Sequence, residues 1–441
     1  MYIKILALKK LYSNLDLIFA FISLVFVFII ASIYFIESES LYISIFASLV
    51  SIIFVIKFYD VVPLFILFLF ISLYPLESIK YFWGDVDLSV YTSFQTRENV
   101  NFILFVNSLF VSSLGIFIPR AVSTVKFDMN LLSLKSKKVF ILVSIICILI
   151  IFFGIQGKSL LEGGKYGTIE KSPLHEYFLL FFMVAIFVQP IKGKFFSITK
   201  YFVFFFYSIK TLLYGGRIEV LQLILLASYF YYIIPGKVSL KFIYIGILLS
   251  FYSAVVLNNF RTHPDLIFSG DFYSLVNPLT IFNETPGQNY LSSNQGDVLQ
   301  SSVRILGILD SGMLTLEDRA LSFFYFTISS ILPSSILPDY VNLSSFRQDL
   351  YASGGGAIIG IYFFTWLGYL GPVVAGLFIA ISVNNFYFND RIILKIYGFV
   401  LLYTFPRWYG YTPIFLVKFA LYSIIIYSMF FFVHRIFIAK K

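Results

Sequence analysis

One short segment of an otherwise apolar sequence places a cation beside two glycines. In LLYGGRIEV (residues 212–220), Gly215 and Gly216 precede Arg217, and Glu219 follows. We expect a helix to start at Arg217, and a helix N-terminus already carries a partial positive charge, so a cation there needs a nearby anion. Glu219 can be that anion in a local ion pair. Alternatively, the two glycines let an anionic ligand approach the backbone and Arg217 binds it.

A second polar segment, NNFRTHPD (residues 258–265), follows a long apolar run. Arg261 stands where a helix is expected to end, a position at which the helix dipole favours a cation. His263 has an imidazole whose ordinary pKa of about 6.5 suits proton transfer, and Asp265 adds a carboxylate. The alternative is a capping arginine followed by a solvated loop histidine.

Two further arginines lie near glycines or aromatic residues. Arg347 and Asp349 precede a run of three glycines that includes Gly354 and Gly355 and leads into an apolar segment. Such a run either provides flexibility or opens a helix whose free N–H groups point at an anion.

The other arginine, Arg407, stands in FPRWYGYTP (residues 405–413) and is followed by Trp408 and Tyr409. These side chains form either an interfacial aromatic belt with a capping arginine or a guanidinium beside rings on which sugars can stack.

The elements that must position these residues are membrane helices. The 441 residues are 59% hydrophobic and 12% charged, with a mean hydropathy of +0.89, which excludes a soluble globular fold. The single cysteine, Cys147, excludes a disulfide framework and a cysteine metal site. The net charge of +9 is scattered between apolar runs, so we expect no nucleic-acid partner.

The apolar runs predict an all-α polytopic membrane protein with about 12 transmembrane helices. We place nine helices with short loops in residues 1–259, a large outer loop at 260–356, and three helices in 357–441. The predicted spans are 16–36, 41–58, 61–76, 100–119, 138–155, 174–191, 197–214, 217–235, 240–259, 357–383, 391–406 and 412–434. The apolar stretch 321–338 is interrupted by proline after about a dozen residues and is expected to be a re-entrant or interfacial segment.

Charge distribution predicts that both termini are cytoplasmic. Lysine dominates the predicted inner segments, whereas most arginines fall in the predicted outer segments. Because the guanidinium group binds phosphate and carboxylate in bidentate fashion, this asymmetry indicates an anion-binding site on the outer side. The outer arginines are Arg97, Arg217, Arg261, Arg304, Arg319, Arg347 and Arg407.

Several conventional catalytic motifs are absent from the sequence. It contains no Walker loop, no dinucleotide-binding fingerprint, no HExxH and no cysteine–histidine cluster. We therefore expect neither a metal nor a cofactor. Few acids lie inside the predicted spans, which argues against a proton-coupled transporter.

In layout and in a few motifs, the chain resembles the Wzy-type O-antigen or capsule repeat-unit polymerases. The shared features are about twelve spans, a large late outer loop, YGGR opening a middle helix, GGGAIIGIYFFTWLGYLG after the loop, and an arginine in the last outer turn. The chain differs at IGIYFFTWLG, where many relatives place an acidic residue before the aromatic run.

The resemblance implies a GT-C-like glycosyltransferase of the bacterial inner membrane. Its substrate would be an undecaprenyl-pyrophosphate-linked oligosaccharide, polymerised at the outer leaflet into O-antigen or capsule, with inversion and without metal. Membrane lipid would be a further partner. A chain-length regulator protein is the implied partner. On this basis Arg217, Arg261 and Arg347 are expected to bind the diphosphate, with Arg407 near the sugar or phosphate. The candidates for activating the acceptor hydroxyl are Glu219, Asp265, Asp349 and His263.

Two alternatives remain open from the sequence. An O-antigen ligase shares the substrate and a similar layout. A lipid-linked oligosaccharide flippase or another secondary transporter can also have twelve spans, although the sequence shows neither paired halves nor charged residues at the middle of its spans.

Overall fold

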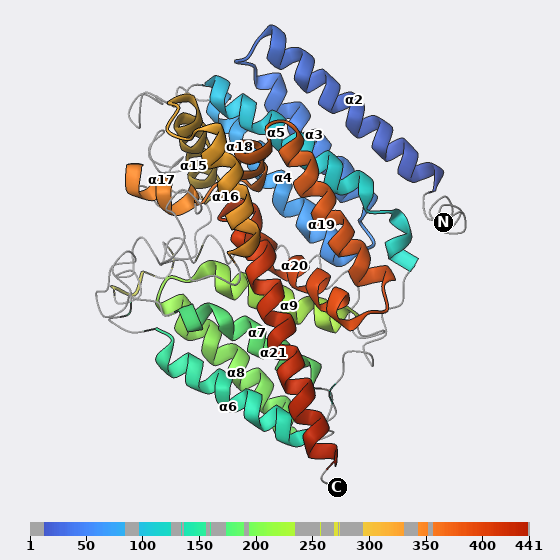
Figure 1. Ribbon diagram of the computed structural model, residues 1–441, viewed down its shortest axis with the longest axis vertical. Helices are drawn as coiled ribbons and strands as arrows, with labels where there is room; N and C mark the ends of the chain where they lie inside the picture. Colours follow the sequence, from blue (N-terminus) through green and yellow to red (C-terminus); the bar gives the residue numbers. More distant parts are fainter. Residues whose placement is uncertain are drawn as a thin grey trace. The chain divides into compact units, whose positions relative to one another are not determined.

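The computed structural model describes residues 13–83, 97–124, 136–155, 173–188, 194–233, 294–329, 343–351 and 356–439, with a few isolated positions between them. Within these ranges every element is helical and no β-strand occurs, so the predicted all-α class is confirmed for this part of the chain (Figure 1). The expected span at 240–259 and most of the expected outer loop before residue 294 lie outside the described residues.

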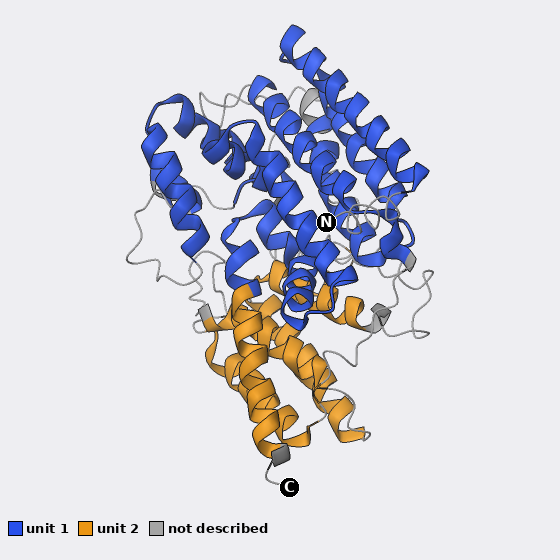
Figure 2. Cartoon of the chain, turned by 45° about the vertical axis from the view of Figure 1, so that its right-hand side comes forward, with its two compact units in different colours: residues 1–125, 285–420 blue, residues 126–284, 421–441 orange. Residues whose placement is uncertain are grey.

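The chain folds into two compact units, each built from separate parts of the sequence (Figure 2). Unit 1 comprises residues 1–125 and 285–420, and unit 2 comprises residues 126–284 and 421–441. The boundaries of these units, after residues 125, 284 and 420, differ from the boundaries at 259 and 356 that the sequence suggests.

The helices of unit 1 come from both ends of the chain. They are α2 (Asn14–Ile36), α3 (Leu41–Lys57), α4 (Val62–Trp83), α5 (Arg97–Phe117), the 3₁₀ helix η2 (Arg120–Thr124), α15 (Asn294–Asp310), α16 (Leu316–Ile328), α17 (Leu343–Tyr351), α18 (Ile359–Leu367), α19 (Leu370–Phe388) and α20 (Ile392–Gly410). Unit 2 contains α6 (Lys137–Phe153), α7 (Pro173–Phe187), α8 (Lys194–Leu213), α9 (Arg217–Ile233) and most of α21 (Ile414–Ala439).

Five of the described helices are long and apolar enough to cross a membrane, as expected for a helical membrane protein. These candidate spans are Asn14–Ile36, Val62–Ile79, Arg97–Phe117, Leu370–Phe388 and Ile414–Phe437. The helices α3 and α7 are apolar but shorter. Most predicted spans therefore correspond to a helix with ends within a few residues, because the run of apolar residues needed to cross about 30 Å is visible in the sequence.

Close helix packing in unit 1 depends on small residues. A Cβ added at Gly376 of α19 would overlap the Ser113 hydroxyl and the Phe110 carbonyl of α5. The two backbones consequently approach closely, as they do at small-residue interfaces between membrane helices. A larger side chain at Gly376 would separate α19 from α5.

The predicted single span over 357–383 is wrong, because the structure contains two helices there. The chain breaks at Gly368, whose φ of 61° lies in the left-handed region that a side chain disfavours. The preceding helix, α18, has only 9 residues, a length of about 14 Å that cannot cross the hydrocarbon. Its residues from Ile359 to Phe363 are nevertheless buried, so α18 is a short helix inside the protein.

The apolar stretch expected to be re-entrant, 321–338, is described only in its first part. That part belongs to α16, which has 13 residues and spans about 20 Å. The helix starts with a capping box in which Thr315 and Asp318 exchange hydrogen bonds. The part of the stretch beyond residue 329 lies outside the described residues.

Candidate functional site

The turn before Arg217 in unit 2 ends one helix and starts the next. The N–H of Gly216 donates to the Thr211 carbonyl and the N–H of Gly215 donates to the Leu212 carbonyl, each over 2.9 Å. Gly215 has a φ of 73°, and this combination is a Schellman motif that closes the C-terminus of α8. The structure thus gives Gly215 a local role, and α9 starts at Arg217 as the sequence predicts.

A buried histidine supports this turn from α7. His175 is 1% exposed, and its Nε2 lies 3.3 Å from the hydroxyl of Thr211, the residue whose carbonyl accepts the Gly216 N–H. The imidazole stacks on Tyr207 of α8 at a centroid distance of 4.8 Å. Glu219, in the first turn of α9, is 4% exposed and so also buried. His175 carries no recognisable signal in the sequence, because its partner Thr211 lies 36 residues away.

Arg347 is the fully buried arginine of α17 in unit 1, with 0% of its surface exposed. Burial, the largest effect, lowers the pKa of Arg347, and the nearby guanidinium of Arg304 lowers it further. The hydroxyl of Tyr362 and the carboxylate of Asp297 act in the opposite direction and raise this pKa. Arginine nevertheless stays protonated in proteins. Two guanidinium groups and one carboxylate therefore act on one another here.

A polar network connects α17, α18 and the turn between α20 and α21. The Tyr362 hydroxyl donates to the Tyr411 carbonyl over 2.7 Å and accepts the N–H of Ala357 over 3.3 Å. The Ser344 hydroxyl, one turn before Arg347, contacts the same Tyr362 hydroxyl and donates to the Tyr411 carbonyl over 3.0 Å. This network holds the start of α18 next to α17.

The helix α15 carries Asp297 and Arg304, the two charged residues that act on Arg347. Asp297, Ser301 and Arg304 follow one another at helical spacing of four and three residues and so share one face. The neighbouring Ser302 is buried and its hydroxyl accepts the N–H of Ile358 over 3.0 Å, just before α18. This spacing is visible in the sequence, but it lies within the expected outer loop at 260–356, so Asp297 is not among the residues that the sequence singles out.

The aromatic residues after Arg407 belong to the core of unit 1. Trp408 is 1% exposed and donates its indole N–H to the Leu401 carbonyl over 2.9 Å. Tyr409 is 0% exposed, donates to the side-chain oxygen of Asn107 over 3.0 Å, and packs edge-to-face on Tyr74. In this structure neither ring offers a free face to a sugar, which corrects the expectation of stacking at Trp408 and Tyr409.

Arg407 itself lies in the last turn of α20 and contacts aromatic faces. Its guanidinium is 5.5 Å from the ring centroids of both Tyr411 and Phe415. Because the carbonyl of Tyr411 is bonded to Tyr362 and Ser344, Arg407 and Arg347 lie on elements that meet at one network. The structure thus brings together the elements that carry two of the predicted arginines.

Another predicted outer arginine has a structural role. The Nε–H of Arg319 in α16 donates to the carbonyl of Thr365, in the last turn of α18. A cation at a helix C-terminus is favoured by the helix dipole. Arg319 is therefore a cap for α18.

Five of the predicted site residues lie outside the part of the chain that the structure describes. Arg261, His263, Asp265, Gly354 and Gly355 lie outside the described residues, and only the backbone of Asp349, in α17, is described. Arg217 and Glu219 belong to unit 2, whereas Arg347 and Arg407 belong to unit 1.

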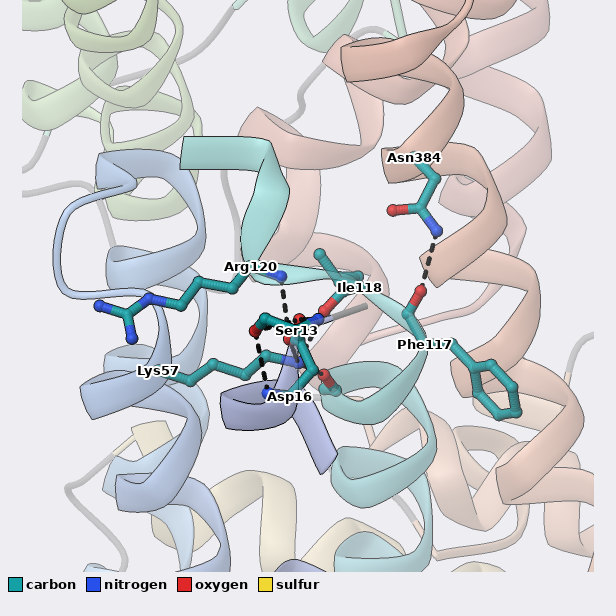
Figure 3. Close-up of polar contacts among 8 residues, drawn as sticks. Ser13, Asp16, Lys57, Phe117, Ile118, Arg120 and Asn384 are labelled. Atoms are coloured by element: carbon teal, nitrogen blue, oxygen red, sulfur yellow. Dashed lines mark hydrogen bonds and ion pairs between the residues drawn. The ribbon is translucent and has the colours of Figure 1, made fainter. Parts of the chain in front are cut away.

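A buried ion pair in unit 1 was not anticipated from the sequence (Figure 3). Lys57 Nζ lies 3.0 Å from Asp16 Oδ1 and also donates to the carbonyls of Gly115 and Ile118 over 2.9 and 2.8 Å. Asp16 in turn accepts the backbone N–H groups of Ser13 and Arg120. With three acceptors for its three protons, Lys57 joins α2, α3 and the end of α5, and its role is structural.

Comparison with protein-family models, with curated proteins and with solved structures gave no match. Within the described ranges, no group of three or more His, Cys, Asp or Glu side chains is arranged to bind a metal ion.

Proposed function

We propose that the protein is a membrane glycosyltransferase that polymerises undecaprenyl-pyrophosphate-linked oligosaccharides into O-antigen or capsule. In this proposal it is a GT-C-like enzyme with about twelve spans in the bacterial inner membrane, and its outer face carries the site. The observation that carries the proposal is the buried Arg347, with Arg304 close enough to lower its pKa further.

The physical argument begins with the cost of placing charge inside a protein. A buried guanidinium costs several kcal/mol to desolvate unless anionic or polar groups compensate for it. A second guanidinium nearby increases that cost, and the carboxylate of Asp297 offsets part of it. A ligand with two adjacent negative groups, such as a pyrophosphate, complements the charge of two neighbouring guanidinium groups.

The reaction would transfer a glycan between two lipid-linked substrates. The oxygen of a hydroxyl on the acceptor attacks the anomeric carbon of the donor glycan, while the bond from that carbon to the phosphate oxygen breaks. The electron pair leaves with the lipid pyrophosphate, whose increased charge Arg347 and Arg304 stabilise. The acceptor proton passes to a carboxylate, for which Asp297 and Asp349 are the candidates in unit 1.

The test is the glycan pattern in cells that lack their own polymerase. Cells expressing the protein are expected to make a ladder of chain lengths. Arg304→Gln, at a half-buried position, is expected to give single repeat units while the protein still inserts in the membrane at normal amount. Arg319→Gln is the matched control, because Arg319 only caps α18. A ladder that persists undiminished in Arg304→Gln would contradict the proposal.

A flippase for the same lipid-linked substrate is the second candidate. Secondary transporters often contain discontinuous helices, and the structure has a break between two helices at Gly368. The two functions differ in product, since a flippase moves the lipid-linked unit without lengthening it. Complementation of a flippase-deficient strain and not of a polymerase-deficient strain would favour the flippase, while rescue of a ligase-deficient strain alone would favour the ligase.

A further inference from the structure

A concentration of positive charge occurs in unit 2, where the start of α6 contacts both the first turns of α8 and the last turns of α21 (Figure 1). The ammonium of Lys138 lies 4.9 Å from the ring centroid of Phe437, which joins α6 to α21. The ammonium of Lys200 lies 5.5 Å from the ring centroid of Phe140, and Phe140 packs edge-to-face on Phe196, which joins α8 to α6. The basic cluster consists of Lys137, Lys138, Lys194, Lys200 and Arg435.

No acid of these three helices balances the basic cluster. The sequences of α6, α8 and α21 contain neither Asp nor Glu. Two of the three helices begin here, and their N-termini add partial positive charge, which the C-terminus of α21 offsets only in part. Five cations beside two helix N-termini repel one another, so this end of unit 2 attracts an anion.

The surface next to the basic cluster is apolar and exposed. On α8, Phe195 is 66% and Ile198 63% exposed, and on α21, Phe432 is 64% and Ile436 40% exposed. This combination of cations at helix ends and exposed apolar side chains along the same helices suits the binding of a lipid. The lipid phosphate would contact the cations, and the acyl chains would pack on the apolar side chains. An acidic protein would match the charge but not this apolar flank.

We propose that the basic cluster binds the phosphate of an anionic phospholipid, with the acyl chains along α8 and α21. The aromatic rings of Phe431, Phe437 and Phe140 hold the cations in place, since the Arg435 guanidinium also lies 4.7 Å from the Phe431 ring centroid. This lipid site is independent of the glycosyltransferase proposal, because it involves none of the residues assigned to that reaction.

The test uses the full-length protein in a neutral detergent and native mass spectrometry to count bound lipids. The probes are phosphatidylglycerol and phosphatidylcholine with the same acyl chains, offered together. The wild type is expected to retain phosphatidylglycerol preferentially. Each cation near an anionic lipid contributes about fivefold in affinity, so Lys138→Gln with Arg435→Gln is expected to lower phosphatidylglycerol affinity about 30-fold.

Two controls separate the lipid site from a general charge effect. Lys138→Arg with Arg435→Lys keeps both charges and is expected to retain the preference. Arg391→Gln neutralises an exposed cation in unit 1 and is expected to change nothing. The proposal would be overturned if the wild type showed no preference for phosphatidylglycerol, or if Lys138→Gln with Arg435→Gln kept that preference unchanged. It would also be overturned if Arg391→Gln lost as much affinity as that double variant, or if inorganic phosphate or a poly-glutamate peptide displaced the lipid.

Discussion

Replacement of Lys57 by Met tests how much of unit 1 depends on its buried ion pair. Lys57 and Asp16 are 1% and 3% exposed, so the substitution leaves the Asp16 carboxylate buried without its cation. It also removes the donor to the Gly115 and Ile118 carbonyls. Breaking a buried pair on one side costs about 3 to 5 kcal/mol, so we expect Lys57→Met to lower the free energy of unfolding by that amount.

A double-mutant cycle separates the pair from its surroundings. Asp16→Asn alone leaves Lys57 charged and buried, whereas Asp16→Asn together with Lys57→Met removes both charges. The double variant is therefore expected to be more stable than the sum of the single losses predicts, with a coupling free energy of about 2 kcal/mol. The assay is denaturation of the purified protein in detergent, followed by loss of helical signal. Single losses below about 1 kcal/mol that simply add would refute the reasoning, because such values are typical of exposed pairs.

Three other substitutions test individual features of the structure. Gly215→Ala is expected to destabilise the turn between α8 and α9 by about 1 to 2 kcal/mol, because Gly215 has a φ of 73°. Gly216→Ala, at a neighbouring glycine, is the control, and an equal loss in both would contradict this explanation. Tyr409→Phe is expected to cost about 1 to 3 kcal/mol in thermal unfolding, since it leaves the side-chain oxygen of Asn107 without its donor; an unchanged stability would refute this. His175→Ala should loosen the same turn as Gly215→Ala and raise amide exchange at the start of α9, and exchange no faster than in the wild type would show that His175 does not support it.

The positions of most helices could be predicted from the sequence, because runs of apolar residues define them. The helix α9 starts at Arg217 as expected, and α3 matches its predicted range to within one residue. The break at Gly368 could not be predicted in this way, since the apolar run continues through it and only the backbone conformation reveals the turn.

The polar contacts of the structure were harder to predict than its helices. Lys57 and Asp16 are far apart in sequence, and each looks like an ordinary charge beside a membrane span. Trp408 and Tyr409 follow an arginine in a polar turn, yet their rings face the core because α20 continues to Gly410. Arg347 was predicted as a site residue from the glycine run after it, whereas its neighbour Arg304 required the fold of α15.

The most direct test of the central claim is binding of a soluble polyprenyl pyrophosphate analogue to the purified protein. If Arg347 and Arg304 hold the pyrophosphate, the wild type binds the pyrophosphate form more tightly than the monophosphate. Arg304→Gln and Arg347→Lys should each weaken binding at least tenfold, with Arg319→Gln unchanged. Equal binding of both analogues, or undiminished binding in both Arg304→Gln and Arg347→Lys with the protein folded, would contradict the account.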